Sequence, residues 1–125
     1  MRIEISHHVD ASEPDADGWY LYHYEYDIYV FSEGATSFFV RAYSDDPGRA
    51  SFQSRLQDDV GHALTSKDLR HPLFIAAADH LREIGKPDLT WLSRREGAYL
   101  PVSEGPAASE GLLSRRFGRF FRPRS

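Results

Sequence analysis

The sequence predicts an α+β fold with an antiparallel sheet of four to five strands and helix packed on one of its faces. Three observations lead to this prediction. Residues 2–9 alternate between apolar and polar side chains, and residues 19–31 are rich in aromatic and β-branched side chains, as strands are. Residues 69–84 carry an apolar stripe with helical spacing. The strand-like segments are grouped ahead of that stripe, which is typical of α+β proteins and not of alternating α/β folds.

The N-terminal part predicts a strand followed by a hairpin. Residues 2–9 alternate, whereas residues 10–18 are acidic and contain Pro and Gly, so they form a loop. Residues 19–31, rich in aromatic and β-branched side chains, form a long strand. The turn at 32–35 contains a glycine, and residues 36–43 form the antiparallel return strand.

We expect a short helix over about residues 47–57. Asp45 or Asp46 can cap its N-terminus, and Pro47 suits the first helical position. Four apolar residues follow at the spacing of one helix face: Phe52, Leu56, Val60 and Leu64. A fourth strand is the competing interpretation, because the glycines in this region weaken the helix.

The main amphipathic helix is expected over about residues 68–84. Its apolar stripe is Leu69, Leu73, Ala77, Leu81 and Ile84. Pro72 cannot donate a helical hydrogen bond, so either residues 66–71 form a separate turn or Pro72 lies in the first turn. Gly85 and Pro87 mark the end of the helix.

The C-terminal part predicts the end of the domain and a tail. Residues 89–93 and 98–102 read as one or two final strands, separated by a turn. Residues 103–125 begin with small and polar side chains and end rich in Arg and Phe. We therefore expect a single domain over 1–102 and a flexible tail over 103–125.

Composition narrows the class of protein. The chain has no cysteine, which excludes disulfides and thiolate sites and fits a reducing compartment. It shows no stretch of roughly 20 apolar residues and no signal-peptide pattern, so we expect a cytoplasmic protein. Residues 112–125 carry five Arg and no acid, and the other 111 residues carry 10 basic and 19 acidic residues, a net charge of −9. An acidic body argues against a dedicated nucleic-acid domain.

His23, Glu25 and Asp27 are the candidate metal or acid–base residues. Alternation places them on one strand face about 6.6 Å apart, and an imidazole with two carboxylates can ligate a divalent metal or transfer protons. The simpler interpretation is a polar, solvent-facing strand surface, because neighbouring side chains on one strand are too far apart to share a metal comfortably. We expect no cofactor.

Four tyrosines form the candidate binding surface on the other face of the same strand: Tyr20, Tyr22, Tyr24 and Tyr26. Such a row can anchor a protein partner or stack bases. The alternative is that this face packs under the main helix, although four buried hydroxyls are hard to satisfy. We expect Ile28 and Val30 to lie in the core, and the tyrosines to extend beyond the body and stay open to a partner.

The basic tail is the third candidate. Its residues are Arg115, Arg116, Arg119, Arg122 and Arg124, interleaved with Phe117, Phe120 and Phe121. Such a segment can bind nucleic acid or an anionic membrane, fold back onto the acidic body, or remain a solvated end.

No catalytic or nucleotide-binding motif accompanies these candidates, and only in size and composition does the chain resemble small α+β proteins of bacteria. We therefore expect a small non-catalytic binding or regulatory protein whose partner is another protein, of immunity or inhibitor type. The alternatives are a metal-dependent or acid–base enzyme, and nucleic-acid or membrane association through the tail.

Overall fold

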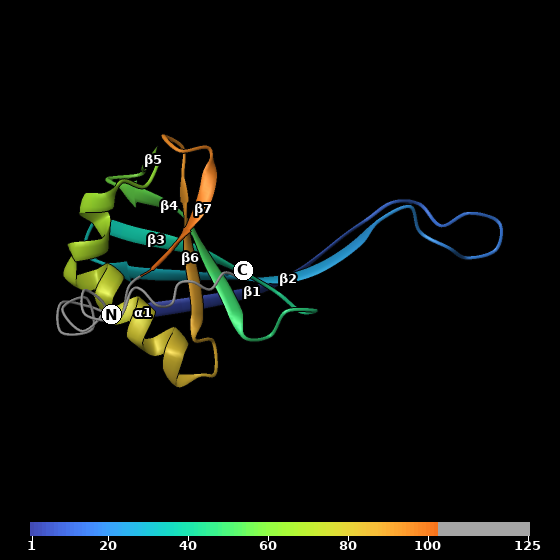
Figure 1. Ribbon diagram of the computed structural model, residues 1–125, viewed down its shortest axis with the longest axis horizontal. Helices are drawn as coiled ribbons and strands as arrows, with labels where there is room; N and C mark the ends of the chain where they lie inside the picture. The colour runs from blue at the N-terminus through green and yellow to red at the C-terminus, as the bar shows by residue number, and fades with distance from the viewer. Residues whose placement is uncertain (103–125) are drawn as a thin grey trace, which may run out of the picture.

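The computed structural model describes residues 1–102, which form an α+β fold with one seven-stranded sheet and one α-helix on a single face (Figure 1). The strands follow the order β1-β2-β3-β4-β6-β7, and β5 pairs with β4 beside β6. The elements are β1 (Arg2–Ala11), β2 (His23–Glu33), β3 (Thr36–Tyr43), β4 (Arg49–Gln57), β5 (Val60–His62), the 3-10 helix η1 (Ser66–Arg70), α1 (Pro72–Glu83), β6 (Asp88–Ser93) and β7 (Ala98–Pro101).

The sheet is mixed and has more strands than the four to five expected. Each pairing is antiparallel except that of β4 with β6, where Arg49–Phe52 runs parallel to Asp88–Trp91. Parallel neighbours need a crossover connection, and α1 lies within the connection between these two strands. Figure 1 shows the helix lying across one side of the sheet.

Aromatic side chains between α1 and the sheet form the centre of the core. The Phe74 ring stacks on Phe52 with ring centroids 4.0 Å apart and meets Phe38 edge-on at 5.4 Å. On β2, Tyr29 and Phe31 face this layer and are buried, whereas Ile28 and Val30 lie on the opposite face and are only partly buried. The expectation that Ile28 and Val30 lie in the core is therefore wrong, because α1 covers the other face of the strand.

The short helix expected over residues 47–57 is wrong, and the competing interpretation of a fourth strand is confirmed as β4. A spacing of four fits a helix, but it is also twice the strand period of two, so the apolar pattern could not separate the two. Ala50 and Phe52 alternate into the core as strand residues do. Asp58 and Asp59 then adopt left-handed backbone angles, φ 51° and 66°, in a two-residue turn that pairs β4 with β5.

The helical region 68–84 is divided at Pro72. Residues 66–70 form η1, and α1 begins at Pro72, where His71 Nδ1 accepts a hydrogen bond from the Leu73 N–H. The expected stop at Gly85 is confirmed. Gly85 has φ 98°, and the Lys86 N–H donates to the Leu81 carbonyl, as in a Schellman motif.

A β-bulge at Gln53 turns a charged side chain toward the core side. Phe39 pairs with Ser54 and Val40 with Phe52, so Gln53 is the extra residue on β4. Beyond the bulge, Arg55 lies opposite the buried Phe38. Its guanidinium donates to Asp68, 2.8 Å away, and this carboxylate is 4% exposed and also accepts the Thr65 N–H at 2.8 Å. The ion pair therefore ties β4 to η1.

We expect Asp68→Ala to lower the free energy of unfolding by about 3 kcal/mol, since removing one partner of a buried pair leaves the other charge uncompensated. Chemical denaturation of the full chain measures this loss. Asp79→Ala is the control, because it breaks an exposed pair with Arg82 worth no more than about 1 kcal/mol. Equal losses in the two variants would contradict a stabilising role for the Arg55–Asp68 pair.

Candidate interaction site on the β1–β2 arm

Residues 7–27, here called the arm, project from the body as the outer parts of β1 and β2 with their connecting loop (Figure 1). The β3 ladder ends at the pair Tyr26 and Tyr43, so the remaining arm is a two-stranded ribbon. The arm contains six acidic residues and no Lys or Arg. Apart from its histidines, the arm therefore carries only acidic titratable side chains with charge at neutral pH.

Local hydrogen bonds order the tip of the arm. Ser12 Oγ accepts the Leu21 N–H at 2.8 Å, and the Ser12 N–H donates to the Tyr22 carbonyl at 3.0 Å. The Asp15 carboxylate accepts the N–H groups of Asp17 and Trp19, both at 2.9 Å. These contacts close the loop that the acidic, Pro- and Gly-containing sequence predicts.

The tyrosine row splits at the point where the arm leaves the body. Tyr26 is held there by Tyr43, with ring centroids 5.6 Å apart, and by Arg41, whose guanidinium carbon lies 4.6 Å from the ring centroid. Tyr20, Tyr22 and Tyr24 lie further out and are 43–52% exposed. The sheet thus extends beyond the part that α1 covers, as expected. Whether these tyrosines bind a partner stays a prediction.

Two apolar side chains at the tip are more exposed than any of the tyrosines. Trp19 is 74% exposed and Leu21 is 90% exposed. The sequence pattern placed both in the long strand expected over residues 19–31, whereas β2 begins only at His23. No local signal in the sequence separates this exposed run from a strand, because a short run of apolar and aromatic residues is also typical of a buried strand.

His23, Glu25 and Asp27 are not brought together in this structure. The His23 ring lies against Tyr20, with centroids 5.2 Å apart, while both carboxylates turn to a different histidine. His7 on β1 contacts Asp27 Oδ1 through Nδ1 at 2.7 Å and Glu25 Oε2 through Nε2 at 3.1 Å. Within residues 1–102, no group of three or more His, Cys, Asp or Glu side chains is placed to hold a metal ion.

His7 links the two strands near the base of the arm by charge. Its hydrogen bond with Asp27, and secondly that with Glu25, raise the pKa of the imidazole above its ordinary value of 6.5. Both ring nitrogens then donate, which favours the imidazolium form. Sequence reasoning missed His7 because its partners lie across the ladder. The register that pairs His7 with Asp27 follows only once β1 is paired with β2.

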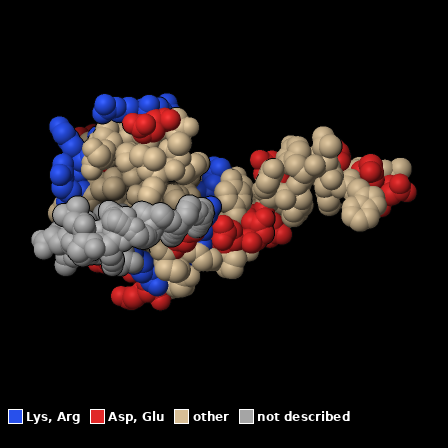
Figure 2. Space-filling model, viewed as in Figure 1, with Lys and Arg blue, Asp and Glu red and all other residues tan. Residues whose placement is uncertain are grey.

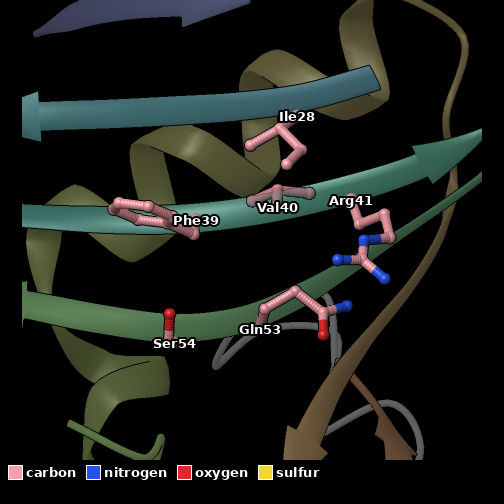
Figure 3. Close-up of a pocket in the computed structure, with 6 residues that line it drawn as sticks. All are labelled: Ile28, Phe39, Val40, Arg41, Gln53 and Ser54. Atoms are coloured by element: carbon pink, nitrogen blue, oxygen red, sulfur yellow. The ribbon is translucent and has the colours of Figure 1, made fainter. Parts of the chain in front are cut away.

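A shallow hollow of about 200 Å³ lies on the sheet face opposite α1, beside the bulge (Figure 3). Its lining comes from β2, β3 and β4: Ile28, Phe39, Val40, Arg41, Gln53 and Ser54. The lining includes one cation and no carboxylate or imidazole. It therefore lacks the paired acid and base that proton-transfer chemistry requires.

The basic tail predicted at 103–125 lies outside the described residues, and so do its arginines and phenylalanines. In residues 1–102 no helix is long and apolar enough to cross a membrane. Comparison of the chain with protein-family models, curated proteins and solved structures gave no match.

We expect Asp27→Asn to lower the pKa of His7 toward 6.5, and by more than Glu25→Gln does, because Asp27 is the larger cause of the shift. An NMR titration of the His7 ring protons measures both changes. An unchanged His7 pKa in both variants would show that these contacts do not form in solution.

The raised pKa of His7 makes the stability of the arm depend on pH. The pKa of His7 is higher in the folded arm than in the unfolded chain, where it is about 6.5. His7 therefore stabilises the arm below pH 6.5, and this stabilisation is lost as the pH rises through the folded-state pKa. Hydrogen-exchange protection of the arm amides should therefore fall as the pH rises above 6.5. His7→Gln should remove this fall and is the matched control.

Proposed function

We propose that this chain is a small cytoplasmic, non-catalytic binding protein of immunity or inhibitor type, whose arm engages a protein partner with a basic surface. The observation that carries the proposal is the arm itself. It places exposed aromatic and apolar side chains among six acidic residues and no basic ones, outside the core of the fold.

The tip has the composition of a binding anchor. Trp19, Tyr20, Leu21 and Tyr22 are exposed in consecutive positions, and a monomeric protein gains nothing by keeping such a patch in water. Tryptophan and tyrosine dominate the binding energy of many interfaces because they bury a large area at a small cost in conformational entropy. The hydrogen bonds of Ser12 and Asp15 hold the tip in place before binding.

The charge of the arm supports a basic partner. Figure 2 shows acidic side chains along the arm and at its base, whereas Lys and Arg gather on the body. The arm has no Lys or Arg, and its six carboxylates outnumber the imidazolium of His7, so a basic surface is attracted to it. Such complementarity raises association rates and rejects acidic competitors.

The test begins with a photo-crosslinking amino acid at Tyr22 in the full-length chain, used to capture contacting proteins in a native lysate. The captured protein is then purified and titrated calorimetrically. We expect a protein of basic isoelectric point, and a Kd raised at least tenfold by replacing Tyr20, Tyr22 and Tyr24 with Ser. Tyr99→Ser is the control, because Tyr99 is 50% exposed on β7, away from the arm. An acidic partner, or equal affinity in all variants, would overturn the proposal.

We also expect the double variant Glu13→Gln, Asp17→Asn to slow association with that partner severalfold at low salt, with little change in dissociation. Stopped-flow or surface plasmon resonance measures the two rates. The control is Glu83→Gln, Glu96→Gln, which removes the same charge from exposed positions on the body. The difference between the two double variants should disappear at high salt.

A further inference from the structure

β1 is a free edge of the sheet. Within the described residues it pairs with β2 alone, and its outer backbone groups have no strand beside them. Natural proteins protect long edges with Pro, bulges or charged side chains. The ten residues of β1 contain no Pro or Lys and its ladder has no register shift, so Arg2, Glu4 and Asp10 are its only fully charged residues. This edge is therefore ready to accept another strand.

The register shows which backbone groups point outward. The Glu25 carbonyl accepts a hydrogen bond from the Ser44 N–H on the β3 side, so the neighbouring residues of β2, Tyr24 and Tyr26, turn their backbone groups to β1. Their partners on β1 are even-numbered. The odd-numbered residues of β1 therefore direct their N–H and C=O groups to the free edge: Ile3, Ile5, His7, Val9 and Ala11.

We propose that two copies of this chain pair antiparallel through the outer edges of β1, with Ser6 opposite Ser6 of the second copy. In this register the two outermost even positions carry opposite charges, because Arg2 faces Asp10. Glu4 faces His8, and Ile3 faces Val9. The β1 sequence is thus complementary to its own reverse.

Other registers lack this complementarity. Odd residues must meet odd residues for the outward groups to bond, so the register can shift only by two residues on one strand. A shift of two residues in one direction places Glu4 opposite Asp10. The same shift in the other direction places Arg2 opposite His8 and Glu4 opposite Ser6, so it loses the Arg2–Asp10 pair. Directly opposed like charges destabilise a sheet, so the Ser6-centred register is favoured.

Pairing of two copies would add a third strand to the two-stranded arm. Beyond the end of β3 the arm has two strands, and an isolated two-stranded ribbon is marginally stable in water. A second β1 adds a third strand along this part, and four residue pairs with about two hydrogen bonds each join the edges. Ile5 and Val9, which are 59% and 57% exposed, then gain neighbours across the new ladder. This inference uses the backbone edge and does not rest on the tyrosines or on the proposed function.

Cysteine cross-linking of the full chain tests the register. The sequence has no cysteine, so Ser6→Cys creates one thiol, placed about 4.5 Å in Cα distance from its counterpart in a non-hydrogen-bonded pair. We expect Ser6→Cys to form a disulfide dimer under mild oxidation, while Glu4→Cys, on the same face of β1, stays largely monomeric. Cross-linking of both to the same extent, or of Glu4→Cys alone, would overturn the register, and a failure of both would overturn the pairing.

Sedimentation of the unmodified chain and of charge variants tests the pairing without a covalent bond. We expect a concentration-dependent dimer whose Kd rises about tenfold in Asp10→Arg, since both copies of the pair become repulsive. The double variant Arg2→Asp, Asp10→Arg should restore the Kd to within about threefold. A monomer at all concentrations up to about 1 mM, or a double variant no tighter than Asp10→Arg, would overturn the proposal.

Discussion

A mismatch of length between the helix and the sheet shapes this protein. The 12 residues of α1 span about 18 Å, whereas the 11 residues of β2 span about 37 Å. One helix can therefore cover only part of the strand, and the covered part is where Tyr29 and Phe31 are buried. The residues before Tyr26 have no helix to pack against, so they leave the body as the arm.

The same mismatch explains why neither face of β2 has a single character along its length. Over the body, one face is aromatic and buried while the other is only partly buried. Over the arm both faces meet water, so one carries the His7, Glu25 and Asp27 contacts and the other carries the exposed tyrosines. The exposed tyrosines, which lie on β2 and in the loop before it, cover one another only in part, so much of their area remains exposed.

The sequence was sufficient for the elements that local chemistry determines. The hairpin turn at 32–35, the return strand at 36–43 and the helix stop at Gly85 follow from turn and capping residues. The sequence did not predict the structure of residues 47–57, because a spacing of four fits both the helical and the strand period. It also did not predict which face of β2 the helix covers, because both faces carry apolar side chains. The partner of Glu25 and Asp27 depended on strand register, since His7 is distant along the chain.

The β1 edge proposed to pair two copies and the tip proposed to bind a partner consist of different residues, so both can be occupied at once. Edge pairing of two copies would take up the backbone of residues 3–9, whereas the tip residues 12–22 lie beyond the paired segment. Because the two strands run antiparallel, the tips would extend from opposite ends of the joined sheet. Each tip would then meet its own partner, and avidity would arise only with a partner whose own sites match that separation. A basic monomer would bind two per dimer without cooperativity between the tips.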